Sequence, residues 1–457
     1  MNDCLAQYYR TPRLCIHFRP KTSLSAPVGY FQFGKTATCY GSYSGRQPAK
    51  VPTEALYDAL SDTVVDDGTI YLPFDPAEVV NNLRCETYTD DGRTGDSPAL
   101  LAQAYYFIRP LLALNVRRRL QRIYLRGWDK LPFPHWPVDC SVDDLFGELL
   151  LLALKSNRHE RIPFVWFWPD GASSAAVMTH DVEEESGRDF CNILMDIDDS
   201  FQIKSSFQIV PEQRYPVSRE FLSSIRDRGF EVAVHDLNHD GHLYRDREEF
   251  LKRAAKINSY GKEYGAEGFR AGVLYRRQLW SDHLRFSYDM SVPNVAHLDP
   301  QRGGCCTVMP FFLGPILEIP VTTTQDYTLF HILNDYSIDL WKRQTEIIMQ
   351  RHGLLSFIVH PDYIIGPRER AVYEQLLDFL NHLREEKGVW IATPSQVNHW
   401  WRQRAEMNLV RDGEGWKIEG CGKERARIAY ASAEDGQLVF TLGENQIQCP
   451  TAEQTNR

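Results

Sequence analysis

The sequence predicts an α/β protein whose central part is a distorted (β/α) barrel of seven or eight strands. Strand-like and helix-like segments alternate regularly over residues 166–405, which is typical of a parallel sheet covered by helices. An α+β region precedes this alternation over residues 1–165. A small β-module with a loose polar tail follows it over residues 406–457. These differences in pattern predict three domains with those boundaries.

The N-terminal region predicts short strands and two helices. The segment 69–74 has strand character, and helices are expected near 99–125 and over 141–155. The second helix begins at Ser141, with Asp144 three residues later. The proline-rich run 131–137 between the helices predicts an extended connector. We find no set of catalytic residues in this region.

The central region supplies the strands and helices of the predicted barrel. Its strand candidates are 176–181, 205–210, 230–235, 268–271, 288–292, 316–321, 354–360 and 389–393. Helical periodicity fills most of the gaps, at 219–228, 246–264, 340–351 and 369–385. A doubly wound open sheet is the alternative fold, because the order of the strands is not written in the sequence.

The C-terminal region predicts a small β-module. Short alternating runs at 416–419, 426–430 and 438–442 are separated by the turn signals Asp412-Gly413 and Asp435-Gly436.

Composition excludes several classes of protein. The 457 residues contain 51 Lys and Arg against 61 Asp and Glu, a net charge of −10, which argues against a nucleic-acid partner. The most apolar stretch, 100–116, is interrupted by Arg109 and Pro110, so no transmembrane helix is expected. The basic segment 117–122 is best interpreted as a solvated helix end, with peripheral membrane contact as the less favoured alternative.

The N-terminus and the cysteines indicate the compartment. No basic segment followed by an apolar run opens the sequence, so no signal peptide is expected. The ten cysteines are irregularly spaced and contain no C-x-x-C pair, which favours free thiols. Both features predict a cytoplasmic location. Nothing in the sequence indicates an oligomeric state.

Three strand candidates end in residues that can bind a metal or move a proton. His235 ends one strand and His239 follows four residues later, so both imidazoles can face one metal ion. Such a pair alone is more often a surface or capping pair. Asp181 and Glu183 end another strand, and a third strand ends at His360. Because the carboxyl ends of barrel strands meet at one mouth, we expect these side chains to converge there.

The carboxylates allow two interpretations. One can complete a His₂–carboxylate metal site while the other acts as the general base. Alternatively they form an acidic helix N-terminus, which the helix dipole favours. We prefer the second interpretation for Glu184 and Glu185, and the first for Asp181 and Glu183.

Together these motifs resemble the polysaccharide deacetylase superfamily, the carbohydrate esterases that include chitin, peptidoglycan and xylan deacetylases, over roughly residues 175–400. The family's H-[ST]-x-x-H motif is similar to His235–His239, with Asp236 in the hydroxyl position. Its strand ending in a general-acid histidine is similar to the segment ending at His360, and its base-orienting arginine is similar to Arg270. The segment 284–291 resembles the family's G-(F/Y)-x-Y-D-S sequence.

The resemblance implies a distorted barrel with one divalent metal, most often zinc, held by a carboxylate and two histidines. The first motif departs from the family's Thr-Phe-Asp-Asp, because Val182 occupies the second aspartate position. Branches with Asp-x-(Asp/Glu) are more similar, and they imply Glu183 as metal ligand and Asp181 as base.

The third motif departs as well. Gly272 and Val273 stand where the family has proline and an aromatic residue. The backbone N–H of Val273 is still able to donate to an oxyanion, and Tyr275 is a candidate for the missing aromatic wall. Ile358 lines the acetyl pocket or is simply strand core.

The resemblance therefore implies removal of an N-acetyl group from an amino sugar of a poly- or oligosaccharide, in surface polysaccharide biosynthesis. Two alternatives stay open. One is a hydrolase of a non-sugar amide on the same barrel. The other is a carbohydrate-binding or scaffolding protein with a degenerate site.

Overall fold

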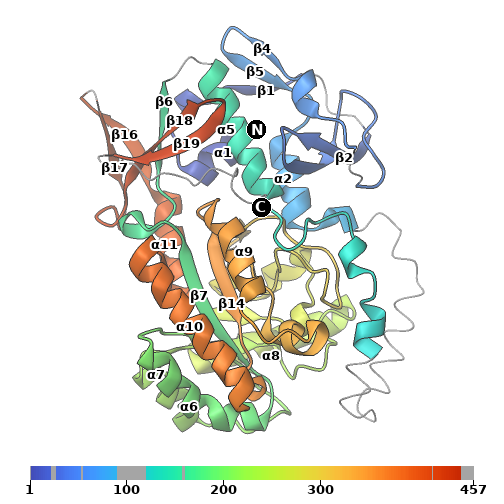
Figure 1. The fold of residues 1–457 in the computed structure, drawn as a ribbon, viewed down its shortest axis with the longest axis vertical. Helices are drawn as coiled ribbons and strands as arrows, with labels where there is room; N and C mark the ends of the chain where they lie inside the picture. The colour runs from blue at the N-terminus through green and yellow to red at the C-terminus, as the bar shows by residue number, and fades with distance from the viewer. Residues whose placement is uncertain are drawn as a thin grey trace.

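The computed structural model describes residues 2–21, 27–52, 55–89, 120–156, 160–413 and 415–443. They form a smaller lobe, at the top of Figure 1, and a larger lobe below it. Residues 90–119 are not described, so most of the helix expected near 99–125 and the first half of the basic segment 117–122 lie outside the described residues.

The larger lobe is built on a nine-stranded sheet. The strands are β7 (Ala175–Val182), β8 (Ser206–Ile209), β9 (Glu231–His235), β10 (Gly268–Arg270), β11 (Tyr288–Asp289), β12 (Phe311–Leu313), β13 (Ile316–Glu318), β14 (Leu354–Ile358) and β15 (Trp390–Ala392). From β7 to β11 and on to β13, successive strands are parallel neighbours, and β14 pairs with the other side of β7. The sheet is therefore curled into a distorted (β/α) barrel, as predicted.

This strand order rules out the doubly wound alternative, which requires a point where the order reverses. All eight predicted strands are present. The strand β12 was not predicted: it has three residues and runs antiparallel to β13 at the edge of the sheet. β15 pairs with only the first part of β7.

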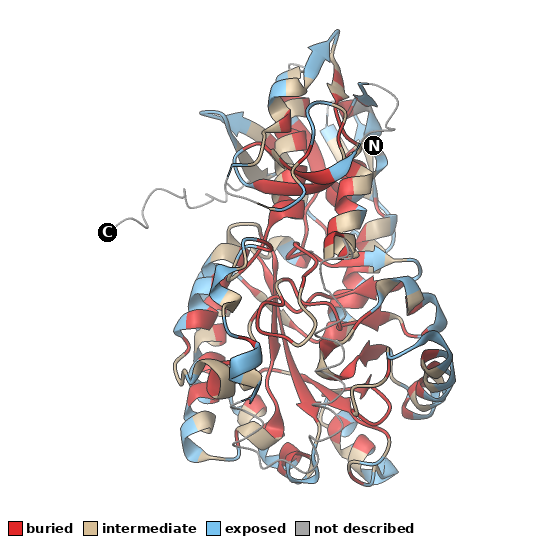
Figure 2. Ribbon diagram, turned by 90° about the vertical axis from the view of Figure 1, so that its right-hand side faces the viewer, coloured by how far each residue is buried: buried red, intermediate tan, exposed pale blue. Residues whose placement is uncertain are grey.

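Helices cover the outside of the barrel. They are α6 (Glu185–Ser200), α7 (Arg219–Asp227), α8 (Arg247–Tyr264), α9 (Asp339–Met349), α10 (Pro367–Lys387) and α11 (Pro394–Glu406). Local sequence sets their ends: the Asp246 carboxylate accepts the N–H of Glu249 at the start of α8, and Gly265 ends that helix in the left-handed conformation. The strands are buried and the outer faces of the helices are exposed (Figure 2).

Side chains rather than a backbone ladder connect β14 to the segment after β13. The Thr322 hydroxyl donates to the Leu354 carbonyl at 2.7 Å and accepts the Ser356 N–H at 2.9 Å. The Thr323 hydroxyl donates to the Ser356 carbonyl at 2.8 Å. Two threonine hydroxyls thus join the barrel where backbone pairing of named strands stops.

The smaller lobe combines both ends of the chain. Its helices and strands are α1 (Asn2–Tyr9), β1 (Phe18–Pro20), β2 (Val28–Phe33), β3 (Ala37–Ser42), β4 (Val64–Asp66), β5 (Thr69–Leu72), α2 (Pro76–Arg84), α5 (Ser141–Ser156), β6 (Arg161–Val165), β16 (Asn408–Asp412), β17 (Gly415–Glu419), β18 (Ile428–Glu434) and β19 (Gln437–Leu442). The predicted C-terminal strands form, but β18 lies between β19 and β6 in one sheet. The C-terminal strands and the N-terminal region therefore share a sheet; the boundaries at 165 and 405 stay a prediction.

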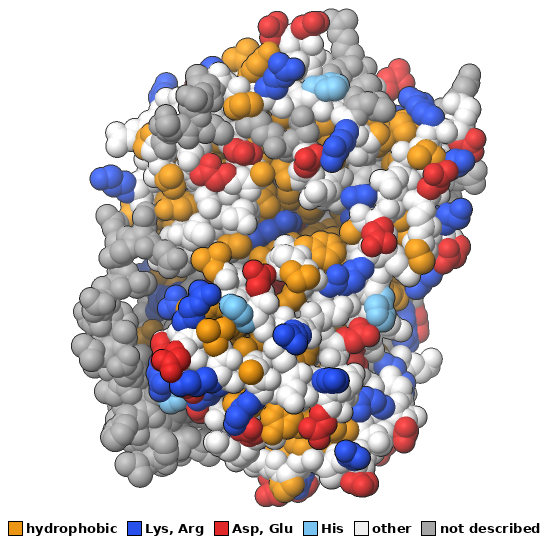
Figure 3. Space-filling model, turned by 180° about the vertical axis from the view of Figure 1, so that it is seen from behind, with side chains coloured by type: hydrophobic (Ala, Val, Ile, Leu, Met, Phe, Trp, Pro, Cys, Tyr) orange, Lys and Arg blue, Asp and Glu red, His pale blue; other side chains and the backbone are white. Residues whose placement is uncertain are grey.

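Buried hydrogen bonds connect the two lobes. The Asp143 carboxylate of α5 accepts hydrogen bonds from the Thr307 hydroxyl and the Val308 N–H of the larger lobe. Hydrophobic side chains reach the surface across the middle of the molecule, where the lobes meet (Figure 3). No helix in the described part of the chain is long and apolar enough to cross a membrane.

Candidate metal centre

The predicted site residues come together beyond the carboxyl ends of four strands. Asp181 is the last residue but one of β7, His235 and Arg270 are the last residues of β9 and β10, and His360 follows β14 by two residues. All four side chains are buried. The convergence expected from the strand pattern is therefore observed.

Glu183, His235 and His239 form a cluster in which one potential ligand atom from each residue lies within 4.8 Å of the others, and Asp181, Glu183 and His360 form a second such group. The Glu183 Oε1 atom lies 2.9 Å from His239 Nε2 and 3.7 Å from His235 Nε2. Burial raises the pKa of Glu183, but the neighbouring histidines outweigh burial and hold it well below its usual range. The carboxylate is thus ionised and faces two imidazole nitrogens.

The histidine nitrogens fit a metal ion. His235 Nδ1 lies 3.1 Å from the Arg270 carbonyl, which fixes the proton on Nδ1 and leaves the Nε2 lone pair facing Glu183. His235 Nε2 and both ring nitrogens of His239 are buried without a partner of hydrogen-bond geometry among the described residues. Buried polar atoms normally have partners, so this donor set of one carboxylate and two imidazoles matches a divalent ion such as zinc.

Asp181 is held by a different partner. Arg270 donates to Asp181 Oδ1 at 2.5 Å and to the Thr179 hydroxyl at 2.9 Å, and it is itself fully buried. Burial raises the pKa of Asp181, but the Arg270 guanidinium more than offsets it, so the pKa lies below its usual range. The other oxygen, Oδ2, lies 3.6 Å from His235 Nε2 and faces the cluster.

His360 is anchored by Asp326, a residue that the sequence did not single out. Asp326 Oδ1 lies 2.6 Å from His360 Nδ1, and Asp326 Oδ2 accepts the His360 backbone N–H at 2.8 Å. The remaining ring nitrogen, Nε2, lies 3.4 Å from Glu183 Oε1. Burial lowers the pKa of His360, but Asp326 and Glu183 raise it well above its usual range.

A strained turn after β10 forms another side of the site. Val273 and Leu274 both have left-handed backbone, with φ of 60° and 53°, at a cost of about 1–3 kcal/mol each. A Cβ atom on Gly272 would lie 2.6 Å from Asp236 Oδ2 and 2.8 Å from His239 Cδ2. Glycine at 272 therefore lets the turn approach the histidine loop closely.

The other residues of the motifs have structural positions. Val182 is fully buried in the core. His180 faces away from the cluster, because its ring nitrogens lie 3.0 Å from the Val359 carbonyl and 3.1 Å from Asp198. Glu184 precedes α6 and pairs with Arg214 at 2.7 Å, as expected for an acidic helix start. The aromatic ring beside His360 is that of Tyr363, at 4.8 Å between centroids.

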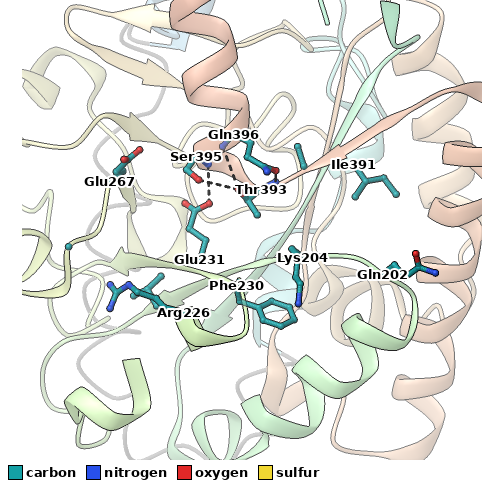
Figure 4. Close-up of a pocket in the computed structure, with 14 residues that line it drawn as sticks. Gln202, Lys204, Arg226, Phe230, Glu231, Glu267, Ile391, Thr393, Ser395 and Gln396 are labelled. Atoms are coloured by element: carbon teal, nitrogen blue, oxygen red, sulfur yellow. Dashed lines mark hydrogen bonds between the residues drawn. The ribbon is translucent and has the colours of Figure 1, made fainter. Parts of the chain in front are cut away.

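A cavity of about 480 Å³ lies elsewhere in the larger lobe (Figure 4). It is lined by Glu231, the first residue of β9, and by Thr393 and Ser395 at the start of α11. The Ser395 N–H donates to Glu231 and the Thr393 hydroxyl caps α11, so these polar groups are already paired. The cavity is at the opposite end of β9 from His235 and is not the metal site.

No model of a known protein family matches the sequence, and no curated protein matches it. Solved structures do match, over about half of the chain. A candidate polysaccharide deacetylase from Mycobacterium smegmatis is 20% identical, with a TM-score of 0.43, over 54% of this chain and 97% of that one. The chain is similar to polysaccharide deacetylases.

Two further structures illustrate the range of this similarity. An allantoinase is 14% identical, with a TM-score of 0.40, over 51% of this chain and 92% of that one. A candidate polysaccharide deacetylase involved in O-antigen biosynthesis, from Bordetella bronchiseptica, is 16% identical, with a TM-score of 0.32, over 51% and 86%. At these identities and TM-scores, the roles of individual residues rest on their geometry in this chain.

Proposed function

We propose that this protein is a metal-dependent hydrolase that removes N-acetyl groups from an amino sugar of a poly- or oligosaccharide. The observation that carries the proposal is the cluster of Glu183, His235 and His239, which lies close to Asp181 and His360. In it, His235 Nε2 and both ring nitrogens of His239 are buried without a hydrogen bond of good geometry to any described residue. A role in surface polysaccharide biosynthesis stays a prediction from the resemblance.

Glu183, His235 and His239 are the residues that would hold the ion. A divalent ion bound there supplies Lewis-acid polarisation of the acyl carbonyl and makes water a stronger acid.

Asp181 is the proposed general base. Arg270 occupies Oδ1, so Oδ2, which faces the cluster, is the atom that accepts a proton from the attacking water. The same guanidinium keeps the carboxylate ionised and fixes its orientation.

His360 is the proposed general acid. Asp326 accepts the proton on Nδ1 and raises the pKa, so Nε2 is protonated and able to donate to the leaving amine. The Val273 N–H has no hydrogen-bond acceptor within the described ranges, so it can donate to the charge that develops on the acyl oxygen.

The space beside the turn suits a small acyl group. Leu274, Val321 and Ile358 form a separate buried apolar cluster. Leu274 and Val321 also line a cavity of about 20 Å³. That volume holds about one water-sized group, which is the size of an acetyl methyl. Larger acyl groups would require the cavity to open.

The direct test is acetate release by the metal-loaded protein from N-acetylglucosamine oligomers, beside a parallel set of small cyclic amides. We expect acetate from the sugars, loss of release in Asp181→Asn, and normal release in the matched control Glu184→Gln, whose side chain pairs with Arg214. Turnover of a cyclic amide without acetate release would replace the proposal with the non-sugar amidase, and no turnover of either set would favour the binding or scaffolding alternative.

A further inference from the structure

The turn Gly272–Tyr275 needs an external restraint. Two consecutive residues other than glycine, one of them β-branched, have positive φ. The backbone bonds that close the turn are long, from the Leu274 N–H to the Ala271 carbonyl at 3.3 Å and from the Tyr275 N–H to the Gly272 carbonyl at 3.2 Å. A strained conformation persists only where its surroundings over-determine it.

Arg276 provides that restraint from inside the larger lobe. Its guanidinium Nη1 donates to the Leu274 carbonyl at 3.0 Å, and Leu274 is the second strained residue. Its backbone is held by Gln301, which accepts the Arg276 N–H at 3.0 Å and donates to the Arg276 carbonyl at 3.1 Å. Gln301 therefore holds the backbone of Arg276, and the side chain of Arg276 holds the turn.

The charge of Arg276 is balanced by Glu86 of the smaller lobe. Arg276 Nε donates to Glu86 Oε2 at 2.6 Å, and Arg276 Nη2 donates to Glu86 Oε1. The Gln278 side chain also donates to Glu86 Oε2, at 2.6 Å. The side chains of Arg276 and Glu86 are 2% and 4% exposed. A bidentate pair aligns the carboxylate with the guanidinium. Glu86 therefore sets the plane of the Arg276 guanidinium, and with it the direction in which Nη1 points toward the Leu274 carbonyl. Gly303 leaves room for this carboxylate, since a Cβ there would lie 2.5 Å from Oε1.

We propose that Glu86 and Arg276 are positioning residues, through which the smaller lobe holds the Gly272–Tyr275 turn in the conformation that the deacetylation site requires. This inference rests on the proposed function. The turn carries Val273, whose N–H is the proposed donor to the acyl oxygen, and Leu274, which lines the cavity proposed for the acyl group. The barrel alone therefore lacks part of its catalytic geometry.

The matched control is the ion pair between Asp144 of α5 and Arg351. It also joins the two lobes and also has two contacts, at 2.7 and 3.3 Å. Arg351 precedes β14, and neither residue contacts the turn. Asp144→Asn therefore removes a pair between lobes without touching the strained segment.

The test uses the full-length, metal-loaded protein with Glu86→Gln, Arg276→Lys and the control Asp144→Asn. In the first two variants we expect kcat on the N-acetyl sugar to fall about 10- to 100-fold, as for a small misplacement of a catalytic group. KM is expected to stay within about threefold, since an interaction made in the transition state is lost. Bound metal stays at the wild-type level, and Asp144→Asn keeps the wild-type kcat.

Hydrogen exchange supplies a readout that does not depend on activity. Backbone amides of 271–278 are expected to exchange about tenfold or more faster in the Glu86 and Arg276 variants, while those of β9 keep their wild-type rates. If Glu86→Gln does not fold, Arg276→Lys, which retains the positive charge, decides the question. A folded variant that keeps the wild-type kcat and the wild-type exchange rates over 271–278 would show that the Glu86–Arg276 pair has only a structural role. Loss of metal in these variants would also overturn the proposal.

The two proposals fail in different ways. If the wild-type protein releases no acetate, the proposed function fails. The hydrogen-exchange measurement over 271–278 still shows whether Glu86 and Arg276 hold the turn. If the wild type is active and both variants match it, the positioning role alone fails.

Discussion

Asp181 and Glu183 stand two residues apart, yet they have different partners. Side chains at i and i+2 of an extended segment project to the same side, which brings both carboxylates to the barrel mouth and puts Val182 into the core. Arg270 then binds Asp181, while the histidines surround Glu183. The geometry therefore favours Glu183 as the ligand and Asp181 as the base.

This division of roles predicts opposite effects on metal binding. Glu183→Ala and His235→Ala should weaken metal affinity at least about 100-fold, because each removes a ligand. Asp181→Asn should keep the ion and lower kcat by about 10²- to 10⁴-fold, the range for a lost general base. Metal content and acetate release on the same samples check both. An Asp181→Asn protein that has lost its metal would reverse the assignment.

The Asp326–His360 pair predicts a shift in the pH profile. His360 acts in its protonated form, and Asp326 raises its pKa, so kcat should fall only as the pH rises through that raised pKa. Asp326→Asn removes a negative charge, lowers the His360 pKa and moves the alkaline limb of kcat to lower pH. An alkaline limb that stays in place would show that His360 is not the titrating acid.

Some of these residues were predictable and some were not. His235, Asp181, Glu183 and His360 stand at the ends of strong strand patterns and His239 follows one of them closely, so their convergence followed from the barrel. Asp326 begins a short helical segment that continues into the π-helical turn Thr328–Leu333, which is too short to show a periodicity, and its contact with His360 spans 34 residues of sequence. The pairing of Glu86 with Arg276, across 190 residues, has no local signal either.

At the scale of elements, buried parallel strands gave the clearest patterns. All eight residues of β7 are buried, which explains why the apolar run Ala175–Met178 marked its first half. β12 has three residues, of which one is buried and one is exposed. An edge strand this short does not show the alternation of apolar and polar residues that predicts a strand.

The threonine connection to β14 predicts a measurable loss of stability. Thr322→Val removes the hydroxyl and leaves the buried Ser356 N–H without its acceptor, which costs about 1–3 kcal/mol. Thr322→Ser keeps the hydroxyl and is the matched control. Urea unfolding of the two variants compares them, and equal free energies of unfolding would show that the hydroxyl contributes nothing.

At the scale of the whole molecule, the two ends of the chain complete one lobe. Arg404, almost fully buried at the end of α11, donates to the carbonyls of Tyr8, Val165 and Trp166. Turn signals and alternation predicted the C-terminal strands correctly. Their pairing with β6 was not predictable, because partners more than 250 residues apart leave no local trace.

This shared sheet predicts that the C-terminal strands support the whole fold. Deleting residues 420–457 exposes the edge of β6 and removes Ala429 and Ala431 from the core. The unfolding temperature should fall by about 5 °C or more, although every proposed metal ligand remains. Thermal unfolding with size-exclusion chromatography checks this, and an unchanged monodisperse protein would contradict it.

The most direct test of the central claim is a crystal structure of the zinc-loaded protein, with the ion located by anomalous scattering. The account predicts one ion about 2.0–2.2 Å from His235 Nε2, His239 Nε2 and a Glu183 oxygen, with Asp181 still bonded to Arg270. An ion bound to Asp181 with Glu183 turned away, or zinc found only at other sites, would contradict it.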